Sequence, residues 1–234
     1  MAAGKKQKEG ASGGDSFLGP IESFAMSVVS PLPIKQLSAW ISAFFRPVET
    51  YEAEKGNALF SGTLVYLLLI GLVSGALSFL LYLVGSALGD SLALQVGIAE
   101  AFLTYLIISP LFLTVLAFIF SAFLFVVAKV LGGKGGYIQQ TFGLTLVYGG
   151  LVLVSIPFSI LARLPFVGFL FALISLLPLI YAIYGYFLLL RHMHGVSSLR
   201  TAIIMLVPAA VAFVLVLAVG VIVGAAAMGR SYLY

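Results

Sequence analysis

The sequence predicts an all-α, polytopic membrane protein with five transmembrane helices and an N-terminal amphipathic interfacial helix. Hydrophobic residues make up 62% of the 234 residues and charged residues only 9%, whereas a soluble domain carries about 25% charged residues. Apolar runs of about 20 residues or more, each long enough to cross a hydrocarbon core of about 30 Å, fill most of the chain after position 57. This composition cannot cover a water-facing surface, so the expected location is the cell membrane.

Residues 1–33 are predicted to form a disordered cytosolic tail, because Gly, Ser, Lys and Pro dominate them. Residues 34–56 are predicted to form amphipathic interfacial helices, with apolar residues at helical spacing and a second helix beginning at Pro47. On this interpretation the apolar face contacts lipid or a partner, and the alternative is a helix buried against the cytosolic side of the membrane domain. The residues predicted to make these contacts are Trp40, Ile41, Phe44 and Phe45.

The membrane domain is predicted over residues 57–234, with spans at 59–84, 101–131, 137–161, 166–190 and 201–227. The second span is long, and Ser109-Pro110 within it is typical of a helix start. We therefore expect a kink or break there, preceded by an amphipathic approach segment over 91–108. Three prolines are expected inside spans three to five, where each removes a backbone donor. These are Pro157, Pro178 and Pro208.

The basic residues predict the orientation. Ten of the twelve Lys and Arg residues lie in the tail and in the connections on the same side of the five predicted spans, which places the N-terminus in the cytosol and the C-terminus outside. In the cytosolic connections, Lys134, Arg191 and Arg200 are predicted to bind anionic lipid headgroups or partner proteins.

Two GxxxG pairs are predicted to pack helices closely, within the monomer or in a homo-oligomer. The first pair is Gly71 and Gly75, and the second is Gly220 and Gly224.

No catalytic, metal or cofactor site and no nucleic-acid binding are predicted. His192 and His194 lack a nearby third ligand, and the GGKGGY segment lacks the Ser or Thr that follows Lys in a P-loop.

Two functions remain open. The first is a non-catalytic protein that organises membrane or binds partner proteins and lipids on the cytosolic side. The alternative is a small-solute or ion transporter or channel, with prolines and tyrosines such as Tyr148 and Tyr181 lining its path. The first is favoured because ionisable groups are nearly absent from the predicted mid-membrane positions.

Three segments carry a family resemblance: FFRPVETYEAEKGN before the first span, GGKGGYIQQTFGLTLVYGGLVLVSIPF, and LPLIYAIYGYFLLLRHMHGVSSLRTA before the last. Over roughly residues 44–223 the chain resembles the Yip1 domain family. The resemblance implies a small integral membrane protein of five spans without enzymatic activity. Eukaryotic members of the family are linked to vesicle trafficking through small prenylated GTPases. This chain lacks their Asp-Leu-Tyr-Gly-Pro segment, so we expect a relative of the prokaryotic type, and involvement of a GTPase stays open.

Overall fold

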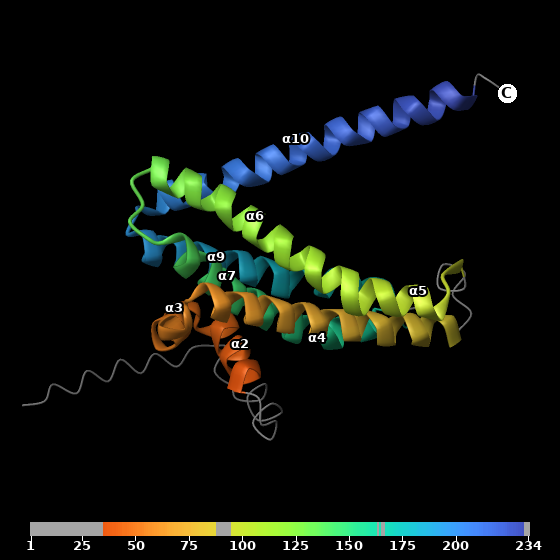
Figure 1. Ribbon diagram of the computed structural model, residues 1–234, viewed down its shortest axis with the longest axis horizontal. Helices are drawn as coiled ribbons and strands as arrows, with labels where there is room; N and C mark the ends of the chain where they lie inside the picture. The colour runs from red at the N-terminus through yellow and green to blue at the C-terminus, as the bar shows by residue number, and fades with distance from the viewer. Residues whose placement is uncertain (1–34, 88–94, 163, 165–166, 232–234) are drawn as a thin grey trace, which may run out of the picture.

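The structure is a computed structural model that describes residues 35–87, 95–162, 164 and 167–231, and every regular element in these ranges is helical (Figure 1). Two short helices, α2 (Lys35–Phe45) and α3 (Pro47–Glu54), come first and are followed by a 3-10 turn, η1 (Lys55–Asn57). The second of these helices begins at Pro47, as the sequence predicts. The predicted tail over 1–33 lies outside the described residues.

Within the described part of the chain, four helical stretches are long and apolar enough to cross a membrane. They are α4 (Phe60–Ala87), the stretch Ile98–Val130, α7 (Tyr137–Leu161) and the stretch Gly168–His194. The helix α10 (Ser198–Ser231) follows, and its apolar segment Ser198–Val211 is shorter than these four stretches. The prediction of an all-helical protein with several spans is therefore confirmed, and the fifth span stays a prediction.

The expected break at Pro110 is absent. Helix α5 (Ile98–Leu103) passes through a π-helical segment, η3 (Thr104–Ile108), directly into α6 (Ser109–Val130). Ile108 has helical dihedral angles, so Ser109 does not cap a new helix. Because proline lacks an N–H and crowds the preceding turn, a widened π turn just before it lets the helix continue. The segment before Pro110 is thus part of the second stretch.

The fourth stretch consists of two helices, α8 (Gly168–Ile174) and α9 (Leu176–His194), which meet at Ser175. The hydroxyl of Ser175 donates to the carbonyl oxygen of Ala172 at 2.6 Å. Pro178 lies inside the fourth stretch, as predicted, and there it occupies the first turn of α9, where a missing backbone donor costs little. Pro157 and Pro208 do lie inside helices, in α7 and α10.

Helices α4, α7 and α9 run side by side, and α6 crosses over them (Figure 1). Buried residues at their centre include Phe142 and Leu146 of α7, Ile70 of α4 and Leu189 of α9. Helix α10 packs its beginning on α6 and α9 and then leaves the other helices.

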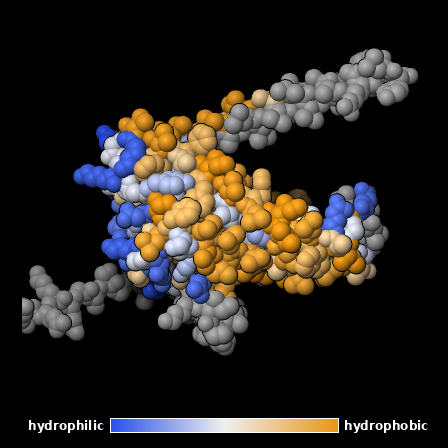
Figure 2. All heavy atoms as spheres, in the orientation of Figure 1, coloured by the Kyte–Doolittle hydropathy of each residue, from blue (hydrophilic) through white to orange (hydrophobic). Residues whose placement is uncertain are grey.

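Hydrophobic residues cover the length of the bundle (Figure 2). A small group of hydrophilic residues lies at the end near α5, and a larger group gathers at the opposite end. We call this end the charged end. It is formed by α3, the first turns of α4, α7 and α10, and the last turns of α6 and α9. Large apolar side chains lie exposed along the helices, including Phe112, Val115 and Phe123 of α6. Such a surface suits hydrocarbon as its solvent.

Candidate docking site at the charged end

Helix α2 lies across α7 at two consecutive glycines. Trp40 of α2 is only 1% exposed. A Cβ at Gly149 would lie 2.6 Å from Cγ of Trp40, and a Cβ at Gly150 would collide with the carbonyl oxygen of Trp40. The edge of the Trp40 ring also meets the ring of Tyr66 on α4, with 6.2 Å between the centroids. The glycine pair therefore forms a notch that admits α2 to close contact with α7.

The apolar face of α2 is consequently a protein interior. Ile41 and Phe44 are buried with Trp40, and Phe45 is half-buried. The Tyr181 hydroxyl of α9 donates to the carbonyl oxygen of Phe45 at 3.2 Å. This arrangement corresponds to the alternative of a helix buried against the membrane domain. It corrects the assignment of Trp40, Ile41 and Phe44 to lipid contact, because buried side chains do not reach lipid.

Helix α3 is held by its own contacts with the bundle. Tyr51 is buried, and a Cβ at Gly143 of α7 would lie 3.2 Å from Cδ2 of Tyr51. Burial raises the pKa of the Tyr51 hydroxyl. On the outer side, Glu52 accepts a hydrogen bond from Lys55 Nζ at 2.6 Å and pairs with His192 Nε2 of α9 at 2.9 Å. The hydrogen bond from Lys55, and then that from His192, lowers the pKa of Glu52.

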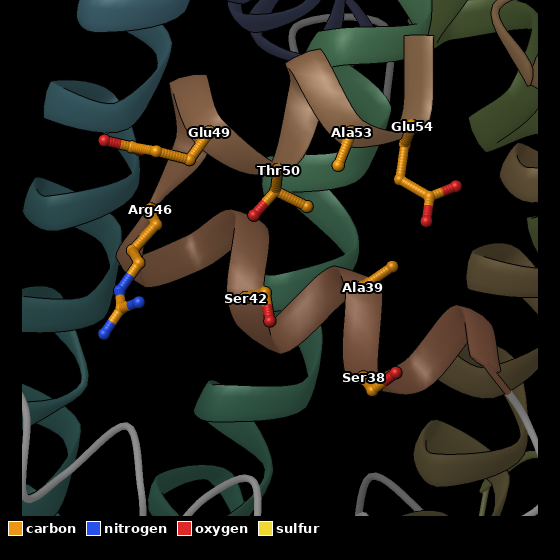
Figure 3. Close-up of a pocket in the computed structure, with 8 residues that line it drawn as sticks. All are labelled: Ser38, Ala39, Ser42, Arg46, Glu49, Thr50, Ala53 and Glu54. Carbon is orange, nitrogen blue, oxygen red and sulfur yellow. The ribbon is translucent and has the colours of Figure 1, made fainter. Parts of the chain in front are cut away.

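A shallow groove of about 420 Å³ lies between α2 and α3 (Figure 3). Thr50 and Ala53 are directed from α3 toward α2, with Glu54 at one end of the groove and Arg46 and Glu49 at the other. The lining is made of hydroxyl groups, small alanines and charged ends, contributed by Ser38, Ala39, Ser42, Arg46, Glu49, Thr50, Ala53 and Glu54. The opposite faces of both helices are buried, so the groove lies on the polar side of the pair.

A glycine-rich turn over 131–136 joins α6 to α7 beside the end of α9. The backbone N–H of Lys134 donates to the carbonyl oxygen of His194 at 3.1 Å, and that of Gly133 donates to Ala128 at 2.8 Å. Gly132 has a φ of +86°, a conformation that favours glycine. The turn is thereby fixed against α9.

Beneath this turn lies a buried polar network. Gln140 Nε2 donates to the carbonyl oxygen of Ser121 at 2.8 Å, and Gln140 Oε1 lies 2.8 Å from Nε2 of His194. Since the Ser121 carbonyl can only accept, it fixes the orientation of the Gln140 amide, and His194 Nε2 must carry the proton that Oε1 accepts. The hydroxyls of Ser121 and Thr141 are 2.8 Å apart. The network ties α6, α7 and α9 together at the charged end.

The structure brings some of the predicted site residues together. Lys134 and Arg200 lie at the same turn, since Arg200 Nη1 donates to the carbonyl oxygen of Leu131 at 3.2 Å. Arg191 is exposed on the last turn of α9. No hydrogen bond joins the side chain of Arg191 to those two residues in the described part of the chain.

The first GxxxG pair faces the second helical stretch. A Cβ at Gly71 would lie 2.7 Å from Cα of Pro110, and a Cβ at Gly75 would collide with the carbonyl oxygen of Tyr105. The pair thus lets α4 approach η3 and α6 within the monomer. Gly220 and Gly224 lie outside the residues whose packing the structure describes.

Several residues of this end were missed by sequence reasoning. Gln140 and Ser121 interrupt apolar helices, and such interruptions often indicate interhelical hydrogen bonds, so they could have been found. The Glu52–His192 pair carried no such signal, because its partners lie far apart in the sequence. Among the described residues, no group of three or more His, Cys, Asp or Glu side chains is placed to hold a metal ion.

Exposed apolar helices, capped at one end by charged side chains, define an α-helical integral membrane protein with multiple spans. The Yip1 domain family model matches residues 41–220. The chain belongs to the Yip1 domain family, as the resemblance predicts. No curated protein and no solved structure matches the chain.

Proposed function

We propose that this protein is a non-catalytic membrane protein that binds partners on the cytosolic side, with the groove between α2 and α3 as its docking site for a partner protein. One observation carries the proposal. The apolar faces of α2 and α3 are anchored on the bundle through Trp40, Phe44 and Tyr51, which leaves their polar faces as a pre-organised surface. A partner then binds without first ordering these helices, which lowers the entropic cost of association.

The charges of the groove favour a partner with basic side chains. Glu49 is exposed, and Glu54 accepts a hydrogen bond from the exposed side chain of Asn57 at 2.8 Å. Because Asn57 is neutral, it leaves the charge of Glu54 in place, so the lining holds two carboxylates against the single cation Arg46. The small side chains of Ala39 and Ala53 leave room between them for a partner side chain.

The cytosolic placement of this surface follows from the positive-inside rule. Lys129, Lys134, Arg191 and Arg200 lie at the same end of the bundle as α3, and excess Lys and Arg predicts the cytosolic side.

Photo-crosslinking in native membranes tests this proposal. A photoreactive residue at Glu49 should capture a defined protein, and Ala53→Arg should abolish that product by filling the groove with a bulky cation. Ser61→Arg is the matched control, because Ser61 is exposed at the start of α4 but does not line the groove. A product that persists in Ala53→Arg, or no product at all, contradicts the proposal.

The transporter or channel alternative predicts solute flux. Tyr181, one of the tyrosines that the sequence places along a path, instead bonds the backbone of α2 through its hydroxyl. Tyr148→Phe is therefore the informative variant. Saturable flux of small solutes or ions into proteoliposomes of the purified protein, reduced in Tyr148→Phe, would replace the docking function with transport.

A further inference from the structure

We propose that three cations around the 131–136 turn form a binding site for the phosphate of an anionic lipid headgroup. The three are Lys129, Lys134 and Arg200, and we call them the basic turn site. This inference names the lipid partner within the proposed function and rests on it for the placement of the protein in a bilayer. It does not use the α2–α3 groove.

The turn itself gathers cations from three elements. Arg200 comes from the first turn of α10 and donates to the carbonyl oxygen of Leu131 at 3.2 Å. Lys129 comes from the last turn of α6, and its Nζ lies 3.5 Å from the carbonyl oxygen of Lys134 and 5.2 Å from the centroid of the Phe125 ring. Lys134 lies in the turn between them. Carbonyl oxygens of one turn thus orient two of the cations beside the third.

The turn is a fixed base for these cations. The carbonyl oxygen of His194 accepts from the backbone N–H of Lys134 at 3.1 Å. The imidazole of His194 fills the space beside two glycines, since a Cβ at Gly133 or Gly135 would lie 2.6 Å or 3.1 Å from its Nδ1. His194 is in turn held by Gln140 in the buried network. The site therefore needs little ordering when an anion binds.

Among the described residues, no carboxylate neutralises the charge of the basic turn site. All three side chains belong to exposed residues. In the part of the chain that the structure describes, ion pairs join Glu52 to Lys55 and His192, and no carboxylate pairs with Lys129, Lys134 or Arg200. Three neighbouring cations without a carboxylate attract a phosphate.

The neighbours of the cations indicate a lipid as the source of that phosphate. Val130 follows Lys129 and is 80% exposed, and Leu199 precedes Arg200 and is 74% exposed. Further apolar side chains continue along the same helices, with Val126 on α6 and Leu206 on α10 also exposed. Figure 2 shows hydrophilic residues directly beside hydrophobic ones at this corner of the molecule. A lipid satisfies both surfaces, because its headgroup meets the cations while its acyl chains cover the apolar side chains.

Native mass spectrometry of the full-length protein in mild detergent tests the site, with phosphatidylglycerol and phosphatidylcholine of identical acyl chains as probes. Phosphatidylglycerol should bind more tightly. Lys134→Gln leaves the hydrogen bonds of the turn in place and should weaken phosphatidylglycerol binding roughly fivefold. Neutralising all three cations to Gln should weaken it on the order of a hundredfold.

Three controls distinguish this site from general surface charge, from the groove and from a site for a free phosphate ester. The charge-conserving set Lys129→Arg, Lys134→Arg and Arg200→Lys should keep the lipid preference, and Ala53→Arg in the groove should not affect it. Free glycerol 3-phosphate should not compete at the concentrations at which the lipid binds.

Equal binding of the two lipids, an unchanged affinity in Lys134→Gln and the triple Gln variant, or effective competition by glycerol 3-phosphate would overturn the proposal. Loss of protein crosslinking at the groove, with lipid binding intact, would instead count against the docking function alone.

Discussion

The glycine notch of α7 decides whether Gly150→Ala stabilises or destabilises the protein. Without α2 docked in the notch, the substitution should stabilise; with α2 docked, it should destabilise. In an exposed helix interior, Gly→Ala stabilises by about 1 kcal/mol, because alanine has the higher helix propensity. At Gly150 a Cβ would collide with the backbone carbonyl oxygen of Trp40, which cannot rotate away. Overpacking of this kind costs about 1–3 kcal/mol. Because the backbone of α2 must move, the cost of overpacking should be about 3 kcal/mol. Subtracting the gain in helix propensity of about 1 kcal/mol, we expect Gly150→Ala to destabilise the docked α2 by roughly 2 kcal/mol.

Hydrogen exchange of the α2 amides in the detergent-solubilised protein measures this effect. A loss of about 2 kcal/mol should speed their exchange on the order of 30-fold. Gly185→Ala in α9 is the matched control, since its Cβ would lie 3.4 Å from Cγ1 of Val147, an ordinary contact. That variant should be neutral or stabilising. If Gly150→Ala slows exchange in α2 as helix propensity alone predicts, the notch does not hold α2 and the groove is not pre-organised.

Three further predictions concern the charged end. His194→Phe and Gln140→Leu should each lower stability by about 1–3 kcal/mol, because each strands a buried polar partner, and thermal unfolding of the double variant should show a loss smaller than the sum. The pKa of Glu52 is lowered because its ionised carboxylate is hydrogen-bonded to Lys55 and His192. These contacts therefore stabilise α3 fully at pH values above the ordinary carboxyl pKa, and the stabilisation is lost as the pH falls through the pKa that Glu52 has in the folded protein. Hydrogen exchange in α3 should therefore rise below about pH 4.5, and Glu52→Gln should remove that pH dependence. For topology, a cysteine at Lys134 should be protected from an impermeant thiol reagent in intact cells while one at Gln95 reacts. Lys134 is preferable to Gly133, where a Cβ would lie 2.6 Å from His194 Nδ1, and labelling of Lys134→Cys from outside would reverse the assigned orientation.

Local sequence signals predict the structure correctly wherever the chain alone decides the outcome. The third span has the predicted bounds, Tyr137–Leu161, because glycines precede it and a long, mostly apolar run follows them. Pro47 begins a helix as predicted, since its fixed φ and missing N–H suit a first helical position. The same signals mislead at Pro110, where a π turn keeps the helix continuous. They place Pro178 inside a span correctly, but they do not predict that Ser175 divides this span into two helices.

The sequence by itself determined that this protein is an all-helical membrane protein, because composition and the length of apolar runs decide which solvent a helix tolerates. Its resemblance to the Yip1 domain family also came from the sequence, through three segments of the chain. It also showed that α2 has one apolar face. Only the tertiary structure decided what covers that face. Lipid and a glycine notch in another helix are both apolar environments, and amphipathicity does not distinguish them. The notch at Gly149 and Gly150, the meeting of Lys129, Lys134 and Arg200 at one turn, and the pairing of Glu52 with His192 all join residues from different helices. Such contacts depend on how the helices pack, which no local periodicity specifies.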